Sequence, residues 1–399
     1  MAFVAPAGTP LTLGEIVRGL AAGWGNDATS SELCRQLGDA SGSVRAWPTV
    51  SGRAAMTMAL RAISRAAGPG RDQVVIPAYT CYSVPAAIER AGLVPVPCDV
   101  DPDTLSLDLD HLDRLRSGAV VALITANLFG IPNALSEIER WSREQGAVML
   151  DDAAQALGAR LDGRPVGGFG HLGLYSFDKG KNISTIQGGA LVARPGPHLE
   201  MLDEEWRELP PSRLVETAST VAKLLPYSLF LPPSRYGFLR RLPMLGLGET
   251  RYDRDYPMSR LSAPLAGLAL LQLARIAALR EGRLANAHAL RRSLDGARVL
   301  KFVKVKTTAE PAYTRFPVRV TSPASRAGVL AAMDRAGIGA TGFYPRALVD
   351  VAEVARRMPA SRESFAGARE VASTIVTLPT HAYSPAGLAA RVRRVFDAM

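Results

Sequence analysis

Short apolar runs alternate with amphipathic stretches between about residues 50 and 195. Apolar residues at helical spacing occupy 54–67, 83–92 and 135–146. Six apolar runs have the length and residue types of buried strands: 74–78, 94–100, 120–127, 147–152, 172–177 and 189–193. This alternation predicts right-handed crossovers and an α/β fold with a mainly parallel sheet covered on both faces. Ligands of such sheets bind at the carboxyl ends of the strands, so we expect functional residues at this edge.

A second, smaller α/β pattern follows in the last third of the chain. It comprises a predicted strand at 313–320, a helix at 325–337, a strand at 373–379 and a C-terminal helix. Between the two patterns, residues 262–294 keep a helical period with no proline after Pro264, which predicts one long helix tying two domains together.

These patterns divide the chain into three parts. We expect an N-terminal arm at 1–45, a large domain at 46–262 with an insertion at about 201–250, and the linking helix with a small C-terminal domain at 263–399.

The insertion has an unusual composition. Across 213–248, leucines and aromatic residues mix with several prolines, and five basic residues face one acidic residue. One hypothesis is a peripheral membrane contact, with apolar side chains in the interface and arginines on lipid phosphates. The other is a segment that packs on its own domain or on a second subunit. We favour the second hypothesis, because the prolines should prevent a long amphipathic helix.

Composition excludes several classes of protein. With 399 residues, 47% hydrophobic and 21% charged, the chain can bury a large core, so it is neither disordered nor a peptide-sized module. Its net charge of +10 favours phosphate-bearing or other anionic partners. Three cysteines without CxxC spacing and five scattered histidines support neither a disulfide framework nor a metal site. Without an evident leader or apolar span, we expect a cytoplasmic protein, with membrane-peripheral placement as the alternative.

The block from 148 to 193 carries the candidate chemistry. Asp152 ends a predicted strand three residues before Gln155, and Ser176 and Lys181 follow the next strand, ahead of a Gly-Gly pair. These side chains should meet at the functional edge of the sheet. A lysine near a carboxylate is ordinarily a surface ion pair, so spacing alone does not establish catalysis.

Several ordered motifs make the resemblance specific: SGRAAMTMAL from Ser51, VVIPAYTCYS from Val74, NLFGIP from Asn127, LDDAAQALGA from Leu150 and SFDKGKNISTIQGG from Ser176. The chain resembles the DegT/DnrJ/EryC1/StrS family of sugar aminotransferases, which use pyridoxal phosphate (PLP) on the fold-type-I scaffold. The resemblance runs from about Ser51 to the C-terminal TLPTH and assigns the coenzyme to the large domain.

The resemblance implies roles for the candidate residues. Lys181 matches the lysine that forms the Schiff base with PLP, whereas Lys179, two positions earlier, is a solvated loop cation. Asp152 matches the aspartate that faces the pyridine nitrogen, and its neighbour Asp151 should point to the other face of the strand. Gln155 matches a glutamine near the ring hydroxyl, with a simple helix-start role as the alternative.

The phosphate of PLP should lie at a helix N-terminus. SGRAA fits this position, because Gly52 permits close approach and the amides of Gly52 and Arg53 open the helix. Arg53 stands where the family more often has Thr or Ser, so it could contact the phosphate or point elsewhere. Ser176 matches another phosphate ligand of the family.

Departures from the family pattern leave further questions. Cys81 stands where many relatives place an aromatic ring against PLP, and Tyr82 is the candidate for that stacking, with core packing as the alternative. Asn127 replaces a frequent histidine. His381, near the expected substrate cleft, could contact substrate or be an ordinary turn residue. The string by which family dimers lend phosphate contacts across the interface appears here as DYPMS, at 255–259, with Asp255 and Pro257 replacing an amide and a guanidinium. We still expect a homodimer.

We therefore expect a PLP-dependent aminotransferase that moves an amino group from a donor such as glutamate to a keto group. By family analogy the keto group belongs to a nucleotide-linked deoxysugar used for cell-surface polysaccharide or secondary metabolites. A minority of the family performs dehydration with a histidine in place of the lysine, so Lys181 favours transamination. The alternatives are a lipid-linked or amphiphilic ketone acceptor at the membrane surface, or a non-catalytic regulatory or nucleic-acid-binding protein. Only the net charge suggests nucleic acid, since no recognised module is present.

Overall fold

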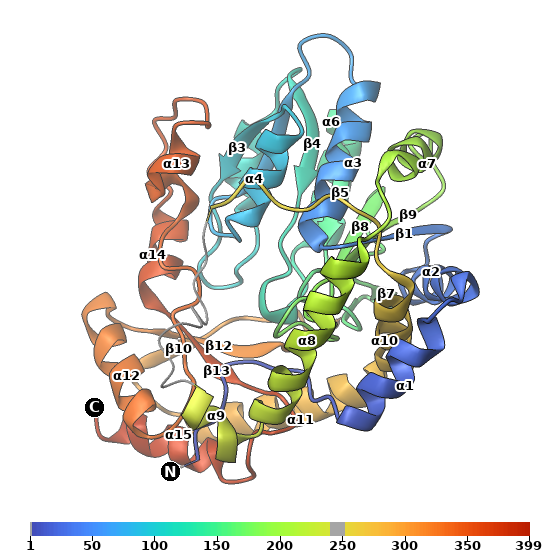
Figure 1. The fold of residues 1–399 in the computed structure, drawn as a ribbon. Coiled ribbons are helices and arrows are strands. Elements are labelled where there is room, and N and C mark those ends of the chain that lie inside the picture. The colour runs from blue at the N-terminus through green and yellow to red at the C-terminus, as the bar shows by residue number, and fades with distance from the viewer. Residues whose placement is uncertain (1, 240–251) are drawn as a thin grey trace.

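The computed structural model describes residues 2–239 and 252–399. Its centre is a seven-stranded sheet in the order β1-β9-β8-β5-β4-β2-β3 (Figure 1). The strands are β1 (Arg45–Thr49), β2 (Gln73–Pro77), β3 (Val94–Cys98), β4 (Val120–Ile124), β5 (Val148–Asp152), β8 (Leu172–Ser176) and β9 (Gly189–Ala193). Five neighbours from β3 to β8 run parallel, and β9 is antiparallel to both β8 and β1. The predicted fold class is confirmed, and β1 is a seventh strand that the pattern did not indicate.

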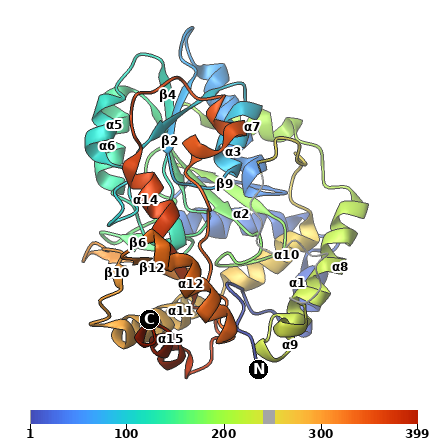
Figure 2. The same ribbon diagram turned by 90° about the vertical axis from the view of Figure 1, so that its left-hand side faces the viewer.

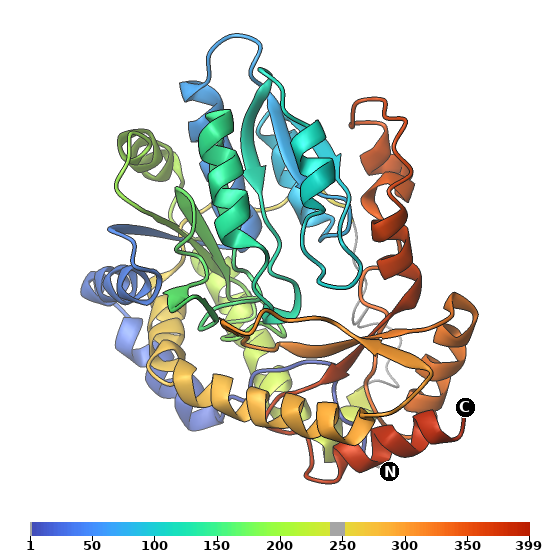
Figure 3. The same ribbon diagram turned by 180° about the vertical axis from the view of Figure 1, so that it is seen from behind.

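Helices cover both faces of this sheet. On one face lie α3 (Gly52–Ala66), α4 (Ser83–Arg90) and α7 (Leu199–Glu208), seen in front of the sheet in Figure 1. On the other face lie α5 (Leu109–Arg114) and α6 (Leu135–Gln145), which Figure 3 shows from behind. Successive side chains of β2 point to opposite faces of the sheet, so the strand contributes to two hydrophobic cores. Val74 and Ile76 belong to the core under α3, and Val75 belongs to the core under α6.

A separate three-stranded antiparallel sheet, β10-β12-β13, is formed by the last third of the chain. Its elements are β10 (Leu300–Phe302), β12 (Arg315–Val320), β13 (Ile375–Pro379), α12 (Pro323–Arg335), α13 (Ala352–Ala355), α14 (Ala366–Thr374) and α15 (Leu388–Asp397). Both described ends of the chain lie beside this sheet (Figure 1). A small sheet of β6 (Arg160–Leu161), β7 (Arg164–Pro165) and β11 (Ala309–Glu310) bridges the two parts of the chain.

The single long helix expected at 262–294 is wrong. The segment forms α10 (Ala263–Leu273) and α11 (Ile276–Leu294), which meet at 58°. Arg275 stands at the break, where its guanidinium pairs with Glu15 and donates to the carbonyl of Pro10 at 2.8 Å. The bend lets the apolar α10 stay buried while α11 runs beside β12 of the β10-β12-β13 sheet. No single helix in 2–239 or 252–399 is long and apolar enough to cross a membrane, although the bent pair qualifies by length and composition.

The insertion also differs from its prediction. It contains α8 (Leu214–Phe230) and α9 (Pro233–Leu239), so a 17-residue helix forms despite Pro226. The buried side chain of Leu224 and the partly buried side chain of Tyr227 pack against the core, and this packing offsets the hydrogen bond that the proline removes. The helix packs on its own chain beside α1 (Leu13–Gly23), as Figures 1 and 2 both show. The end of the predicted segment, at 240–248, lies outside the described residues.

Candidate active site

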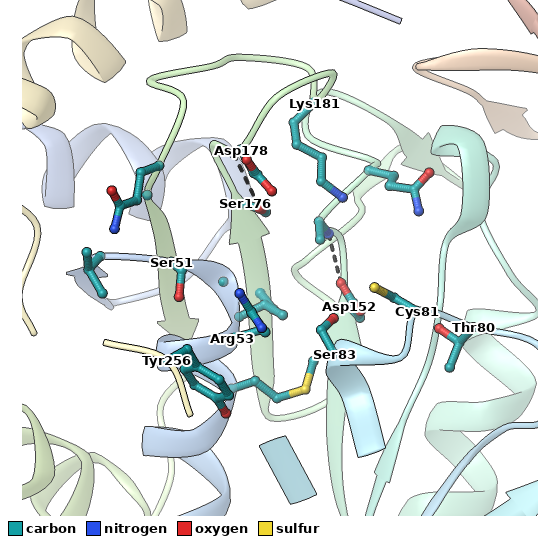
Figure 4. Close-up of a pocket in the computed structure, with 18 of the residues that line it drawn as sticks. Ser51, Arg53, Thr80, Cys81, Ser83, Asp152, Ser176, Asp178, Lys181 and Tyr256 are labelled. Carbon is teal, nitrogen blue, oxygen red and sulfur yellow. Dashed lines mark hydrogen bonds between the residues drawn. The ribbon is translucent and has the colours of Figure 1, made fainter. Parts of the chain in front are cut away.

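A pocket of about 900 Å³ opens where β5 and β8 end and α3 begins (Figure 4). This is the edge at which the sequence predicted functional residues. Three basic side chains and three acidic side chains line it: Arg53, Lys181, Lys223, Asp152, Asp178 and Asp253. Seven of the eight predicted site residues lie in its wall: Gly52, Arg53, Cys81, Asp152, Gln155, Ser176 and Lys181.

The two neighbouring aspartates at the end of β5 have different surroundings. Asp152 faces the pocket, and its Oδ1 accepts the N–H of Ala154 at 2.9 Å (Figure 4). Its Oδ2 has no donor among the described residues. Burial raises the pKa of Asp152 to about 6, although the Ala154 amide and the charge of Lys181 lower it. The carboxylate is therefore short of partners and suited to a cationic N–H that enters the pocket.

Asp151 points to the opposite face of β5, as the sequence predicted. It is fully buried and accepts four hydrogen bonds, from the amides of Gly167 at 2.6 Å and Phe169 at 3.4 Å, from Asn127 Nδ2 at 2.7 Å and from Thr125 Oγ1 at 3.2 Å. Burial nevertheless raises its pKa to about 6. This carboxylate is structural, because every one of its bonds is to the protein.

Lys181 reaches the pocket from the loop that follows β8 (Figure 4). Its carbonyl oxygen is tied to the N-terminal segment by the hydroxyl of Thr9, at 2.5 Å. Lys179, on the same loop, is absent from the pocket wall formed by the described residues. The structure thus separates the two lysines as the sequence analysis expected.

The start of α3 forms a cradle against the end of β8. Ser51 caps the helix by accepting the Ala54 amide at 3.1 Å, so the amides of Gly52 and Arg53 are left without intrahelical acceptors. A Cβ on Gly52 would lie 3.2 Å from Cβ of Ser176 and 3.5 Å from its hydroxyl. Glycine therefore keeps open a space lined by two amides, a hydroxyl and the positive end of a helix, which suits an anion.

Arg53 extends from this cradle into the pocket (Figure 4). Its guanidinium lies 4.7 Å from the ring centroid of Tyr256, whose hydroxyl is 2.6 Å from that of Thr57. No carboxylate pairs with Arg53 in the described part of the chain. The tyrosine therefore holds the guanidinium beside the cradle while its charge stays unneutralised.

The DYPMS string lines the pocket of its own chain through Tyr256 and Pro257. Asp255 is exposed and is not part of the described wall. Three arginines near this string are candidates to replace the lost guanidinium, and two of them are engaged elsewhere: Arg254 pairs with Glu89, and Arg260 donates to the carbonyls of Trp206 and Arg207. The third, Arg251, lies outside the described residues.

Gln155 and Asn127 are both buried at the pocket wall. Oε1 of Gln155 accepts the amide of Phe129 at 3.0 Å, which leaves its Nε2 as a donor. Asn127 is held more completely: its Nδ2 donates to Asp151 and to the carbonyl of Asp152, and its Oδ1 accepts the amide of Asn133. We infer that Asn127 braces the two aspartates.

The structure does not bring Tyr82 into the pocket. It is 5% exposed, belongs to the core under α3, and stacks on Tyr344 with ring centroids 6.2 Å apart. Tyr344 itself lines the pocket beside Cys81, and burial raises the pKa of its phenol well above the usual value. Sequence reasoning missed Tyr344, because it comes from a segment about 260 residues after Tyr82.

Lys223, like Asp178 and Asp253, is a charged wall residue that was not among the predicted site residues, and it reaches the pocket from α8 of the insertion. Thr220, one turn earlier, donates to Oε1 of Gln187 at 2.7 Å and ties α8 to the loop after Lys181. His381 is fully buried, and its Nε2 contacts the carbonyl oxygen of Ala5 at 2.8 Å. Burial lowers the pKa of His381 to about 4. Because it is buried and is not part of the described pocket wall, His381 is a residue of the protein interior. Across 2–239 and 252–399, no group of three or more metal-ligating side chains is placed to hold an ion.

Comparison with known proteins extends the sequence resemblance. An L-glutamine:2-deoxy-scyllo-inosose aminotransferase of Streptomyces kanamyceticus is 30% identical over 203 residues, which are 49% of this chain and 47% of that protein. A UDP-N-acetyl-3-dehydro-alpha-D-glucosamine 3-aminotransferase of Acidithiobacillus ferrooxidans is 32% identical over 150 residues, 38% of this chain and 40% of that protein. Each alignment spans less than half of the relative's length.

Solved structures share the whole fold. PseC of Helicobacter pylori, an aminotransferase involved in the biosynthesis of pseudoaminic acid, aligns over 100% of both chains with a TM-score of 0.80 and 16% identity. At this identity the likeness concerns the fold. The model of the DegT/DnrJ/EryC1/StrS aminotransferase family matches residues 15–204 and 242–399, and the chain belongs to that family.

Proposed function

We propose that this protein is a PLP-dependent aminotransferase that transfers an amino group to the keto group of a nucleotide-linked sugar. The observation that carries the proposal is the meeting of Lys181 and Asp152 in one pocket, at the carboxyl ends of parallel strands and next to an anion cradle. The family of the chain supports the same chemistry.

The pocket residues fit PLP. When bound, PLP supplies an aldehyde that links covalently to an amine and a ring that accepts an electron pair. Asp152 would hold the proton on the pyridine nitrogen, and its unpartnered Oδ2 is available for that bond. The amides of Gly52 and Arg53, the hydroxyl of Ser176 and the guanidinium of Arg53 would hold the phosphate. Nε2 of Gln155 would donate to the ring oxygen.

Lys181 has two tasks in this scheme. Its amine anchors the coenzyme and must be neutral to do so. Once free of the coenzyme, the same Nζ would accept the proton from the α-carbon of the donor, and in the second half of the cycle it would deliver a proton to the carbon that receives the nitrogen. We propose glutamate as the donor; the name of the Streptomyces relative makes glutamine the second candidate.

The acceptor is proposed from charge and from a relative. Lys223 extends to the pocket from α8, and the net charge of +10 favours a substrate that carries a diphosphate. The Acidithiobacillus relative is named for a keto sugar linked to UDP. Such products feed cell-surface polysaccharide or secondary-metabolite synthesis. We further propose that the enzyme is a cytoplasmic homodimer, which light scattering would test.

The test begins with absorbance of the purified protein. A covalent link between Lys181 and PLP gives a yellow protein, and borohydride followed by peptide mass spectrometry should place the coenzyme on Lys181. Half-reactions of the amino form with a panel of nucleotide keto-sugars then identify the acceptor. A colourless protein that binds DNA with steep salt dependence would overturn the proposal in favour of the non-catalytic alternative.

A second candidate acceptor is a lipid-linked or other amphiphilic ketone. It is favoured by exposed apolar side chains on α8 and α9, namely Leu214, Val215, Leu225, Leu229 and Phe238. Flotation with vesicles that contain anionic lipid would support it. Equal partitioning of the wild type and a Leu225→Ser/Leu229→Ser variant would remove it.

A further inference from the structure

Lys181 sits on a backbone that two distant parts of the chain hold in place. Its carbonyl oxygen accepts the hydroxyl of Thr9 at 2.5 Å and Nη2 of Arg283 at 3.3 Å. Thr9 belongs to the N-terminal segment before α1, and Arg283 belongs to α11. The two donors also bond to each other, because Nη2 of Arg283 donates to Thr9 Oγ1 at 3.2 Å.

Arg283 is unusual for a buried cation. It is 2% exposed, and no carboxylate pairs with it in the described part of the chain. Its other acceptors are the carbonyls of Gly8 at 3.0 Å and Thr314 at 3.3 Å. Burying a guanidinium without a carboxylate is costly, so neutral acceptors must be fixed around it. Three of its four acceptors are the carbonyl of Lys181 and two groups of the N-terminal segment beside it, the carbonyl of Gly8 and the hydroxyl of Thr9.

The insertion holds the same segment from the other side. Tyr227 of α8 is partly buried against the core, and its hydroxyl accepts the amide of Thr9 at 3.0 Å. A Cβ on Gly180, next to Lys181, would lie 3.1 Å from Cβ of Ala7, so the N-terminal segment also packs directly on the loop. Residues 7–9 therefore lie clamped between α8, α11 and the loop of Lys181.

We propose that Thr9 and Arg283 are positioning residues for Lys181, and that with Tyr227 they fix the backbone from which its amine reaches the pocket. The proposal rests on the proposed role of Lys181. A lysine side chain has four flexible carbons, so its reach is defined only where its backbone is fixed. Proton transfer depends on placement within about 1 Å, which gives the clamp a catalytic consequence.

The experiment compares three variants of the full chain. Thr9→Val removes the hydroxyl at nearly constant volume, and Thr9→Ser restores a hydroxyl. The matched control is Thr374→Val on α14, which removes a similarly buried hydroxyl that donates to the carbonyl of Glu370 at 2.6 Å. Should Thr9→Val fail to fold, Tyr227→Phe removes the acceptor of the Thr9 amide instead.

Two readouts are measured. The first is hydrogen exchange of the amides at 177–188 in the protein without coenzyme, where losing one hydrogen bond should speed exchange about two- to tenfold. The second is the pH midpoint of the visible band of the Lys181–PLP link. We expect Thr9→Val to change both, Thr9→Ser to restore both, and Thr374→Val to change neither.

Equal exchange in Thr9→Val and Thr374→Val, or an unchanged midpoint in Thr9→Val, would overturn the clamp. Failure of the proposed function is distinguishable, because wild-type protein would then show no borohydride-stable coenzyme on Lys181 whatever the exchange data give.

Discussion

Replacing Asp152 with asparagine should make the coenzyme-free protein more stable. In the free protein this carboxyl has one hydrogen bond, to the Ala154 amide, and its pKa is raised from 3.8 to about 6. A shift of about two units corresponds to at most about 3 kcal/mol of lost stability in the ionised form. Asparagine keeps the shape and the acceptor for Ala154 without the charge, so Asp152→Asn should recover most of this loss.

The gain has a defined pH dependence. Because the folded-state pKa is above the unfolded one, the wild type is fully stabilised below about pH 4 and loses stability as the pH rises through 6. The advantage of Asp152→Asn should therefore be largest at pH 8 and fall to roughly half at pH 5. Urea unfolding of both proteins at the two pH values, followed by circular dichroism, measures it.

Asp151 provides the matched control. Its pKa is also raised to about 6, yet both of its oxygens accept hydrogen bonds from the protein. In Asp151→Asn an amide group would face the N–H of Gly167 or the amide of Asn127, and we expect a loss of about 1–3 kcal/mol. Equal behaviour of the two variants, or no gain for Asp152→Asn at pH 8, would refute the reasoning. With PLP present the sign should reverse for Asp152→Asn, because the ring nitrogen loses its partner.

Three further substitutions test the pocket. Lys181→Ala should abolish the visible coenzyme band and reduce transamination by on the order of 10³-fold, whereas Lys179→Ala should leave both unchanged. Arg53→Ala should weaken PLP binding about 10- to 100-fold in a fluorescence titration, and Arg61→Ala, on the same helix but outside the described wall, should not. Gly52→Ala should weaken PLP binding about tenfold, because its Cβ would lie 3.2 Å from that of Ser176; Gly68→Ala, in open space, is the control.

The central sheet could be predicted because its strands carry their own signal. Each of the six runs is mainly apolar, and two of the parallel strands end in polar residues of the functional edge, Asp152 and Ser176. β1 lacked that signal: it is five residues long, contains Pro48 and pairs only with β9 at the edge of the sheet, where proline is tolerated.

Features that depend on tertiary packing could not be predicted. The break between α10 and α11 leaves the helical period intact on both sides, so only the contacts of Arg275 mark it. Pro226 disfavours a helix locally, yet α8 forms because Leu224 and Tyr227 pack against the core. Tyr344 and Lys223 reach the pocket from remote segments, and their neighbours in sequence give no sign of it.

Two departures from the family sequence pattern, in the DYPMS string and in SGRAA, lie close together in the fold. The DYPMS string lacks the guanidinium that the family pattern places there, while SGRAA carries an extra one at Arg53. These two segments are about 200 residues apart, yet Arg53 lies 4.7 Å from the ring of Tyr256 within DYPMS. Arg254 and Arg260 bond to other parts of the chain. Among the described residues of the pocket wall, Arg53 supplies the guanidinium. A cation supplied from the cradle itself would make phosphate binding independent of a partner subunit, so Arg53→Ala should weaken PLP binding equally at protein concentrations above and below the dissociation constant of the proposed dimer.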